Sequence, residues 1–153
     1  MTQQLPGGNS WLVREPYCYV RKNGTRIYVP PANLGTFEEL YKTPLWSTDY
    51  GSIPKIFQNV FPKDGILAPI YVIHDWIYNS EMFSRDECDE ILLEGAAELG
   101  YDLAERDVIW AAVRVGGGVT WDKHDPVYVT QMKAYYSTFM SEAPMRWPEL
   151  FNN

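Results

Sequence analysis

The chain has 153 residues, of which 46% are hydrophobic, a length and composition typical of one globular domain. Its formal net charge is −7 and its lysines and arginines form no cluster, which argues against binding to nucleic-acid phosphates or to an anionic membrane. No segment approaches the roughly 20 apolar residues of a membrane span. The first ten residues lack the apolar core of a secretory signal, so synthesis in the cytoplasm is expected.

The N-terminal part of the sequence predicts antiparallel strands. Residues 1–10 are polar and are expected to form a flexible arm. Residues 11–31 predict a β-hairpin, because two segments rich in aromatic and β-branched residues flank Asn23 and Gly24, the strongest short hairpin signal. The next part of the chain predicts two short helices, at residues 36–41 and 55–60.

The remainder of the chain predicts a helical body over residues 48–140. It begins with a loop at 48–54, and a turn at 62–65 precedes the longer helices. Those helices are expected at residues 68–78, 84–99, 102–115 and 127–140. The three glycines at 116–118 are expected to end the third of them, and residues 141–153 are expected to form an irregular tail. The predicted fold is a single α+β domain, with a small antiparallel sheet packed on three to four helices.

The first two long helices are predicted to form an antiparallel pair. His74 and Tyr78 are four residues apart, as are Arg85 and Asp89, so each pair shares one face of its helix. If the chain reverses between the two helices, residues at equal distances from the turn lie opposite each other on the two helices. His74 then faces Asp89, and Tyr78 faces Arg85.

This geometry suits the activation of water. A neutral histidine is a suitable base near pH 7, and a carboxylate on its other nitrogen fixes its tautomer. His74 and Asp89 are therefore candidate catalytic residues. Asp75 and Asp49 are candidate calcium ligands, because calcium prefers carboxylate and carbonyl oxygens.

A structural interpretation of the same residues stays open. Buried His, Asp, Arg and Tyr side chains often form a hydrogen-bonded network that only holds two helices together. Tyr78, Arg85 and Ser52 are expected to support such a network. Ser52 has no GxSxG context that would favour a nucleophile over a residue that caps a turn.

Two other residue types carry weaker signals. His124 lies in a polar Asp-Lys-His-Asp-Pro segment and is expected to be solvated, and the chain lacks the Cys/His spacing of a zinc site. Cys18 and Cys88 are expected to be buried thiols and not a disulfide.

Two resemblances involve these motifs. From about Trp11 to Trp121, the joint pattern TD-x-x-SIP, HD-x-x-Y and R-x-x-x-D resembles an uncharacterised family of short proteins from tailed phages and prophages. That resemblance implies a phage origin, with synthesis in the host cytoplasm and incorporation into the virion as one outcome.

The second resemblance is local. HDWIY with an Arg and an Asp on the following helix is similar to the catalytic helix pair of small secreted bacterial phospholipases. It implies that His74 activates water, Asp75 binds calcium and Asp89 orients the histidine, with Asp49 as a further calcium ligand. The animal enzymes' calcium loop and helix-pair disulfides are missing, and so is a signal peptide.

Two functions are therefore expected from the sequence. One is a calcium-dependent hydrolase that acts on a lipid or another ester. The alternative is a non-catalytic virion component of the tail, baseplate or neck that contacts other virion proteins.

Overall fold

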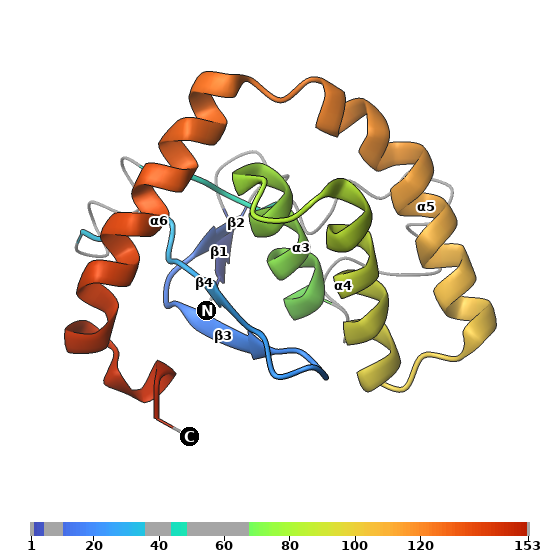
Figure 1. The fold of residues 1–153 in the computed structure, drawn as a ribbon, viewed down its shortest axis with the longest axis horizontal. Helices are drawn as coiled ribbons and strands as arrows, with labels where there is room; N and C mark the ends of the chain where they lie inside the picture. Colours follow the sequence, from blue (N-terminus) through green and yellow to red (C-terminus); the bar gives the residue numbers. More distant parts are fainter. Residues whose placement is uncertain (1, 5–10, 36–43, 49–67, 153) are drawn as a thin grey trace.

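The computed structural model describes residues 2–4, 11–35, 44–48 and 68–152. In this part of the chain, two short antiparallel sheets lie beside four α-helices (Figure 1). The architecture is the predicted α+β fold. The two predicted short helices, the turn at 62–65 and nearly all of the loop at 48–54 lie outside the described residues.

The predicted hairpin forms around Gly24. Strand β3, Tyr17–Val20, pairs antiparallel with β4, Arg26–Val29, and the register places Tyr17 opposite Val29. Gly24 has a φ of +87°, a left-handed conformation that glycine adopts without the steric cost of a Cβ. The Asn-Gly signal therefore located the turn correctly.

The first predicted strand is divided. Trp11–Val13 forms β2, which pairs not with the hairpin but with β1, Thr2–Gln4. Part of the segment expected to be a flexible arm is thus a strand. Pro16 separates β2 from β3, and proline interrupts a strand because it has no N–H to donate.

The β3–β4 hairpin is attached to the second long helix by hydrogen bonds to carboxylates of that helix, chiefly from Arg21. Arg21 Nη2 lies 3.1 Å from Glu94 Oε2, and the Lys22 backbone N–H donates to the other oxygen of Glu94 at 2.7 Å. The Arg21 side chain is only 12% exposed. Partial burial and a second hydrogen bond make this contact stronger than an ordinary surface ion pair.

The predicted helix pair is present. Helix α3 spans Ala68–Ser80 and helix α4 spans Arg85–Glu98, and the two contact each other along their length. Ser84 caps α4 as predicted, since its hydroxyl accepts a hydrogen bond from the Glu87 N–H. The turn includes Glu81, whose φ of +47° is unusual for a residue with a side chain.

The predicted end of the third helix is wrong. Helix α5 spans Leu103–Asp122 and continues through the glycines at 116–118. The reason is tertiary packing, because a Cβ on Gly117 would lie 2.6 Å from the hydroxyl oxygen of Tyr78. Gly117 and Gly118 leave room on α5 for the ends of the Tyr78 and Arg85 side chains, and they do not act as a stop signal.

The last helix is also longer than predicted. Helix α6 spans Pro126–Arg146, and it passes residue 140, where the sequence predicts its end. It contains Pro144, which cannot donate to the carbonyl four residues earlier. Buried Ala143 keeps this turn packed on the core, and only then does the short 3₁₀ helix Pro148–Leu150 begin.

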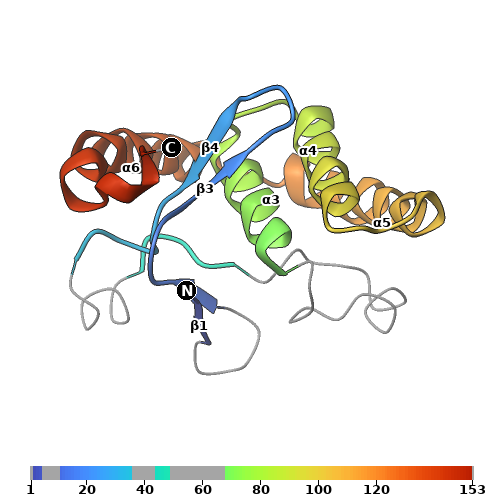
Figure 2. The same ribbon diagram turned by 90° about the horizontal axis from the view of Figure 1, so that it is seen from below.

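Helix α3 lies at the centre of the described structure. It contacts α4 on one side, α6 on another, and strand β4 (Figures 1 and 2). Trp76 is fully buried there and packs against Trp46, with ring centroids 5.0 Å apart. Burying such large side chains contributes most of the stability of this region.

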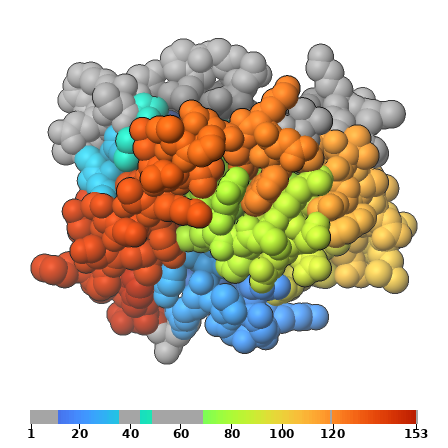
Figure 3. Space-filling model, turned by 45° about the horizontal axis from the view of Figure 1, so that its top comes forward, coloured from blue at the N-terminus to red at the C-terminus, as the bar shows by residue number. Residues whose placement is uncertain are grey.

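The surface view places α4 between α6 and α5, with the hairpin along one edge (Figure 3). Within the described residues, no helix has the length and apolar character needed to cross a membrane.

Candidate functional site: a buried His–Asp–Arg network

His74 and Asp89 form a buried hydrogen bond between α3 and α4. Their atoms Nε2 and Oδ1 are 2.8 Å apart, as the equal spacing from the turn predicts. The side chain of His74 is 7% exposed and that of Asp89 is 0% exposed. The carboxylate therefore accepts the Nε2–H and fixes the orientation of the ring.

Arg114 on α5 is the third member of the network. Its Nη1 lies 2.9 Å from Asp89 Oδ2 and 2.7 Å from Oδ1 of Asp86. Burial alone would raise the pKa of the Asp89 carboxyl, but the hydrogen bonds and charges of His74 and Arg114 hold this pKa below its usual value. Asp89 is therefore ionised at neutral pH, although its side chain has no exposed surface.

The second predicted pair lies one helical turn nearer the α3–α4 turn. Arg85 Nε donates to the hydroxyl of Tyr78 at 3.0 Å, and Arg85 Nη2 donates to the Arg114 carbonyl oxygen at 2.7 Å. A Cβ on Gly118 would lie 3.2 Å from the Arg85 guanidinium. These contacts tie α5 to both helices of the pair and fix the backbone that carries Arg114.

The Tyr78 ring also covers one side of His74. The two ring centroids are 4.5 Å apart, and burial raises the pKa of the Tyr78 hydroxyl despite the Arg85 hydrogen bond. Trp121 packs edge-on against Tyr78, at 5.0 Å between centroids. Tyr78 is thus the aromatic neighbour of the histidine, and Trp121 supports Tyr78 in turn.

Asp75 lies next to His74 in sequence but belongs to a different set of contacts. The hydroxyl of Thr48 donates to Asp75 Oδ2 at 2.5 Å. Thr48 directly precedes Asp49 in the chain, and Asp49 and Ser52 lie outside the described residues. The structure thus brings the start of the TD-x-x-SIP motif to the helix that carries the HD-x-x-Y motif.

The described residues supply only part of a calcium site. Calcium takes six to eight oxygen ligands, whereas Asp75 and Thr48 offer one carboxylate and one hydroxyl. Within the described ranges, no three His, Cys, Asp or Glu side chains are grouped as a metal site. The donor type suits calcium, and the pairing of Asp75 with Asp49 stays a prediction.

The expectation that His124 is solvated is wrong. Its side chain is 9% exposed, and its Nδ1 lies 2.9 Å from Oε1 of Glu81. Its Nε2 is buried and, among the described residues, has no hydrogen-bond partner. This contact links the α3–α4 turn to the α5–α6 turn.

Both cysteines are free thiols, as predicted, but only Cys88 is buried as expected. Cys88 is fully buried on α4, and burial raises its pKa. Cys18 on β3 is half-buried. The helix pair is therefore held by packing and hydrogen bonds.

The fold and site define an α+β protein with a His–Asp–Arg network between three helices. The chain belongs to the family described as Protein of unknown function (DUF1353), whose model matches residues 11–113. The matched region includes His74, Asp75 and Asp89 but ends one residue before Arg114. No curated protein and no solved structure matches the chain.

Proposed function

We propose that this chain is a phage-encoded hydrolase of lipid or other esters, in which His74 is the general base and Asp89 its orienting carboxylate. The observation that supports it is the 2.8 Å hydrogen bond from His74 Nε2 to the buried carboxylate of Asp89. With its proton on Nε2, the ring keeps a lone pair on Nδ1.

The reaction requires one proton transfer in each direction. His74 Nδ1 accepts a proton from water as the water oxygen bonds to the ester carbonyl carbon. The ester C–O bond then breaks, and the proton passes to the departing alcohol oxygen. Ionised Asp89 stabilises the imidazolium between these steps.

Arg114 affects both the charge and the orientation of the Asp89 carboxylate. It shares the Asp89 carboxylate with His74 and offsets part of its negative charge. A carboxylate held from both sides cannot rotate away from the ring, so the Nε2–H tautomer of His74 is maintained.

Calcium is the proposed cofactor, with Asp75 and Asp49 as its carboxylate ligands. The contact from Thr48 to Asp75 supports this pairing, because Thr48 is bonded to Asp49. Bound calcium would polarise the ester carbonyl and stabilise the negative charge that develops on its oxygen.

The choice of an ester substrate and of a phage source rests on the sequence resemblances. The HDWIY helix and its partner are similar to the catalytic helix pair of small secreted phospholipases, and the three joint motifs resemble a family from tailed phages. A phage would use such an activity at entry or at lysis of its host.

The test is an ester hydrolysis assay in millimolar calcium with micellar short-chain phosphatidylcholine. His74→Ala should lower the rate by about 100- to 10,000-fold, the usual contribution of a general base. His124→Ala is the matched control, because it removes the chain's other histidine and should leave the rate unchanged. Circular dichroism of both variants would check that they fold.

The burial of His74 favours a second candidate function. A side chain that is 7% exposed and covered by Tyr78 also suits a network that only joins helices. In that case the protein is a non-catalytic virion component of the tail, baseplate or neck. Two results together would favour this function over hydrolysis. The folded wild-type protein would be inert on lipids and simple esters, and it would be present at a fixed copy number in purified phage particles.

A further inference from the structure

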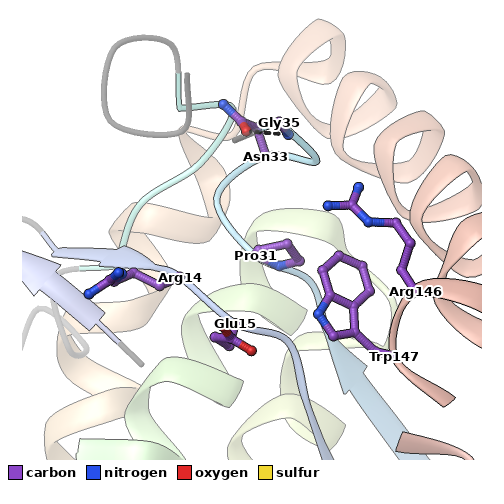
Figure 4. A pocket seen from close by; sticks show the side chains of 7 residues that line it. All are labelled: Arg14, Glu15, Pro31, Asn33, Gly35, Arg146 and Trp147. Atoms are coloured by element: carbon purple, nitrogen blue, oxygen red, sulfur yellow. Dashed lines mark hydrogen bonds between the residues drawn. The ribbon is translucent and has the colours of Figure 1, made fainter. Parts of the chain in front are cut away.

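A pocket of about 220 Å³ opens between the segment after β2 and the C-terminal end of α6 (Figure 4). Three segments that are distant in sequence meet there. Its lining residues are Arg14, Glu15, Pro31, Asn33, Gly35, Arg146 and Trp147. None of them belongs to the His74 network, so the pocket is a separate feature of the molecule.

Arg146 is held in one orientation at this pocket. Its Nη1 donates to the Leu34 carbonyl oxygen at 2.6 Å and lies 3.4 Å from Oε2 of Glu142. Its guanidinium carbon lies 4.4 Å from the centroid of the Trp147 ring. Within the described part of the chain, both hydrogen bonds of Arg146 come from Nη1. The N–H groups of Nε and Nη2 therefore remain available to a ligand.

Trp147 adds a second kind of donor. Figure 4 shows its indole nitrogen on the side of the ring that faces Glu15, and no described group accepts this N–H. The Arg146 guanidinium points from α6 toward the segment that carries Pro31 and Gly35 (Figure 4). Arginine and indole N–H groups around one space can bind the oxygens of a carboxylate or a phosphate.

The charges around the pocket determine whether it can attract an anion. The chain carries a net charge of −7, and the C-terminal end of α6 has a partial negative charge, so both disfavour an anion. Attraction must therefore come from the arginines that line the pocket, Arg146 and Arg14. Glu15 on the opposite wall would repel a second negative group on the same ligand.

We infer that this pocket binds a small ligand through one carboxylate or phosphate group, held by Arg146 and the indole N–H of Trp147. The inference is independent of whether His74 is catalytic, because the two sites share no residue.

The test is a titration of the full chain with inorganic phosphate and, separately, with acetate, at constant ionic strength. Proton–nitrogen NMR resolves indole N–H signals, and Trp147→Phe would assign the signal of Trp147 among the six tryptophans. A saturable shift of that signal by either anion supports the site and identifies the preferred group. Linear or absent shifts up to tens of millimolar with both anions would overturn it.

Three variants separate this site from general charge effects. Arg146→Gln should weaken binding by roughly tenfold or more, since it removes the charge-assisted hydrogen bonds. Arg106→Gln is the matched control, because Arg106 donates to the carbonyl of Asp102, just before its own helix, and does not line the pocket. This variant should bind the anion as wild type does. Glu15→Gln should bind more tightly. Unchanged affinity in Glu15→Gln would show that the anion binds elsewhere. Because Glu15 is exposed, this variant should fold, and it tests the site even if Arg146→Gln does not fold.

Discussion

Arg114 reaches the buried carboxylate of Asp89 from a third helix, at 2.9 Å, and occupies the oxygen that His74 leaves free. The carboxylate thus joins α3, α4 and α5 at one point. It is fully buried, so each hydrogen bond there forms away from competing water. The network is a structural junction whether or not it is also catalytic.

Replacing Asp89 by Ala should destabilise the fold by about 1–3 kcal/mol, because the change leaves the buried Nε2–H of His74 without its acceptor. The measurement is urea denaturation followed by circular dichroism. Asp86→Ala is the matched control, since Asp86 also pairs with Arg114 but its side chain is 73% exposed. It should change the free energy of unfolding by less than about 1 kcal/mol. Equal losses in the two variants would contradict a special role for the buried carboxylate.

The same carboxylate predicts how stability depends on pH. The pKa of Asp89 is lower in the folded chain than in the unfolded chain, where an aspartate titrates near about 3.9. The folded state therefore gains stability above that pH and loses it as pH falls through the folded pKa. Urea denaturation at several pH values should show the advantage of wild type over Asp89→Asn shrinking below about pH 4. An advantage that grows in acid would contradict the assigned cause.

The helix pair could be predicted because its signals are local. The four-residue spacing within each helix and the cap at Ser84 place His74 opposite Asp89 without knowledge of the rest of the fold. The hairpin turn at Gly24 is equally local, and it was also predicted correctly. Where neighbouring residues determine the geometry, sequence reasoning is sufficient.

Arg114 could not be predicted because its position depends on tertiary packing. A run of three glycines normally ends a helix, and the sequence gives no sign that Tyr78 will require small residues on α5. His124 was missed for a similar reason, since its partner Glu81 lies 43 residues away. A polar segment indicates exposure only when no distant side chain buries it.

If calcium binds between Asp49 and Asp75 as proposed, it should raise the melting temperature, because such a site would exist only in the folded chain. Thermal denaturation in millimolar calcium and in chelator would measure the shift. Asp75→Asn should reduce it, and Asp86→Asn should not, because Asp86 is an exposed carboxylate on a different helix. Identical melting curves with calcium and chelator would remove calcium from the proposed function.

Gly117→Ala should destabilise the protein, although alanine is the better helix former by about 1 kcal/mol. The new Cβ would lie 2.6 Å from the Tyr78 hydroxyl oxygen, and crowding of this kind typically costs about 1–3 kcal/mol. Gly118→Ala is the matched control and should cost less, because its Cβ meets the end of the Arg85 side chain at 3.2 Å. In a Tyr78→Phe background the loss from Gly117→Ala should shrink, since the hydroxyl is gone. A double-mutant cycle by urea denaturation measures this coupling, and strictly additive losses would show that Gly117 does not pack on Tyr78 as described.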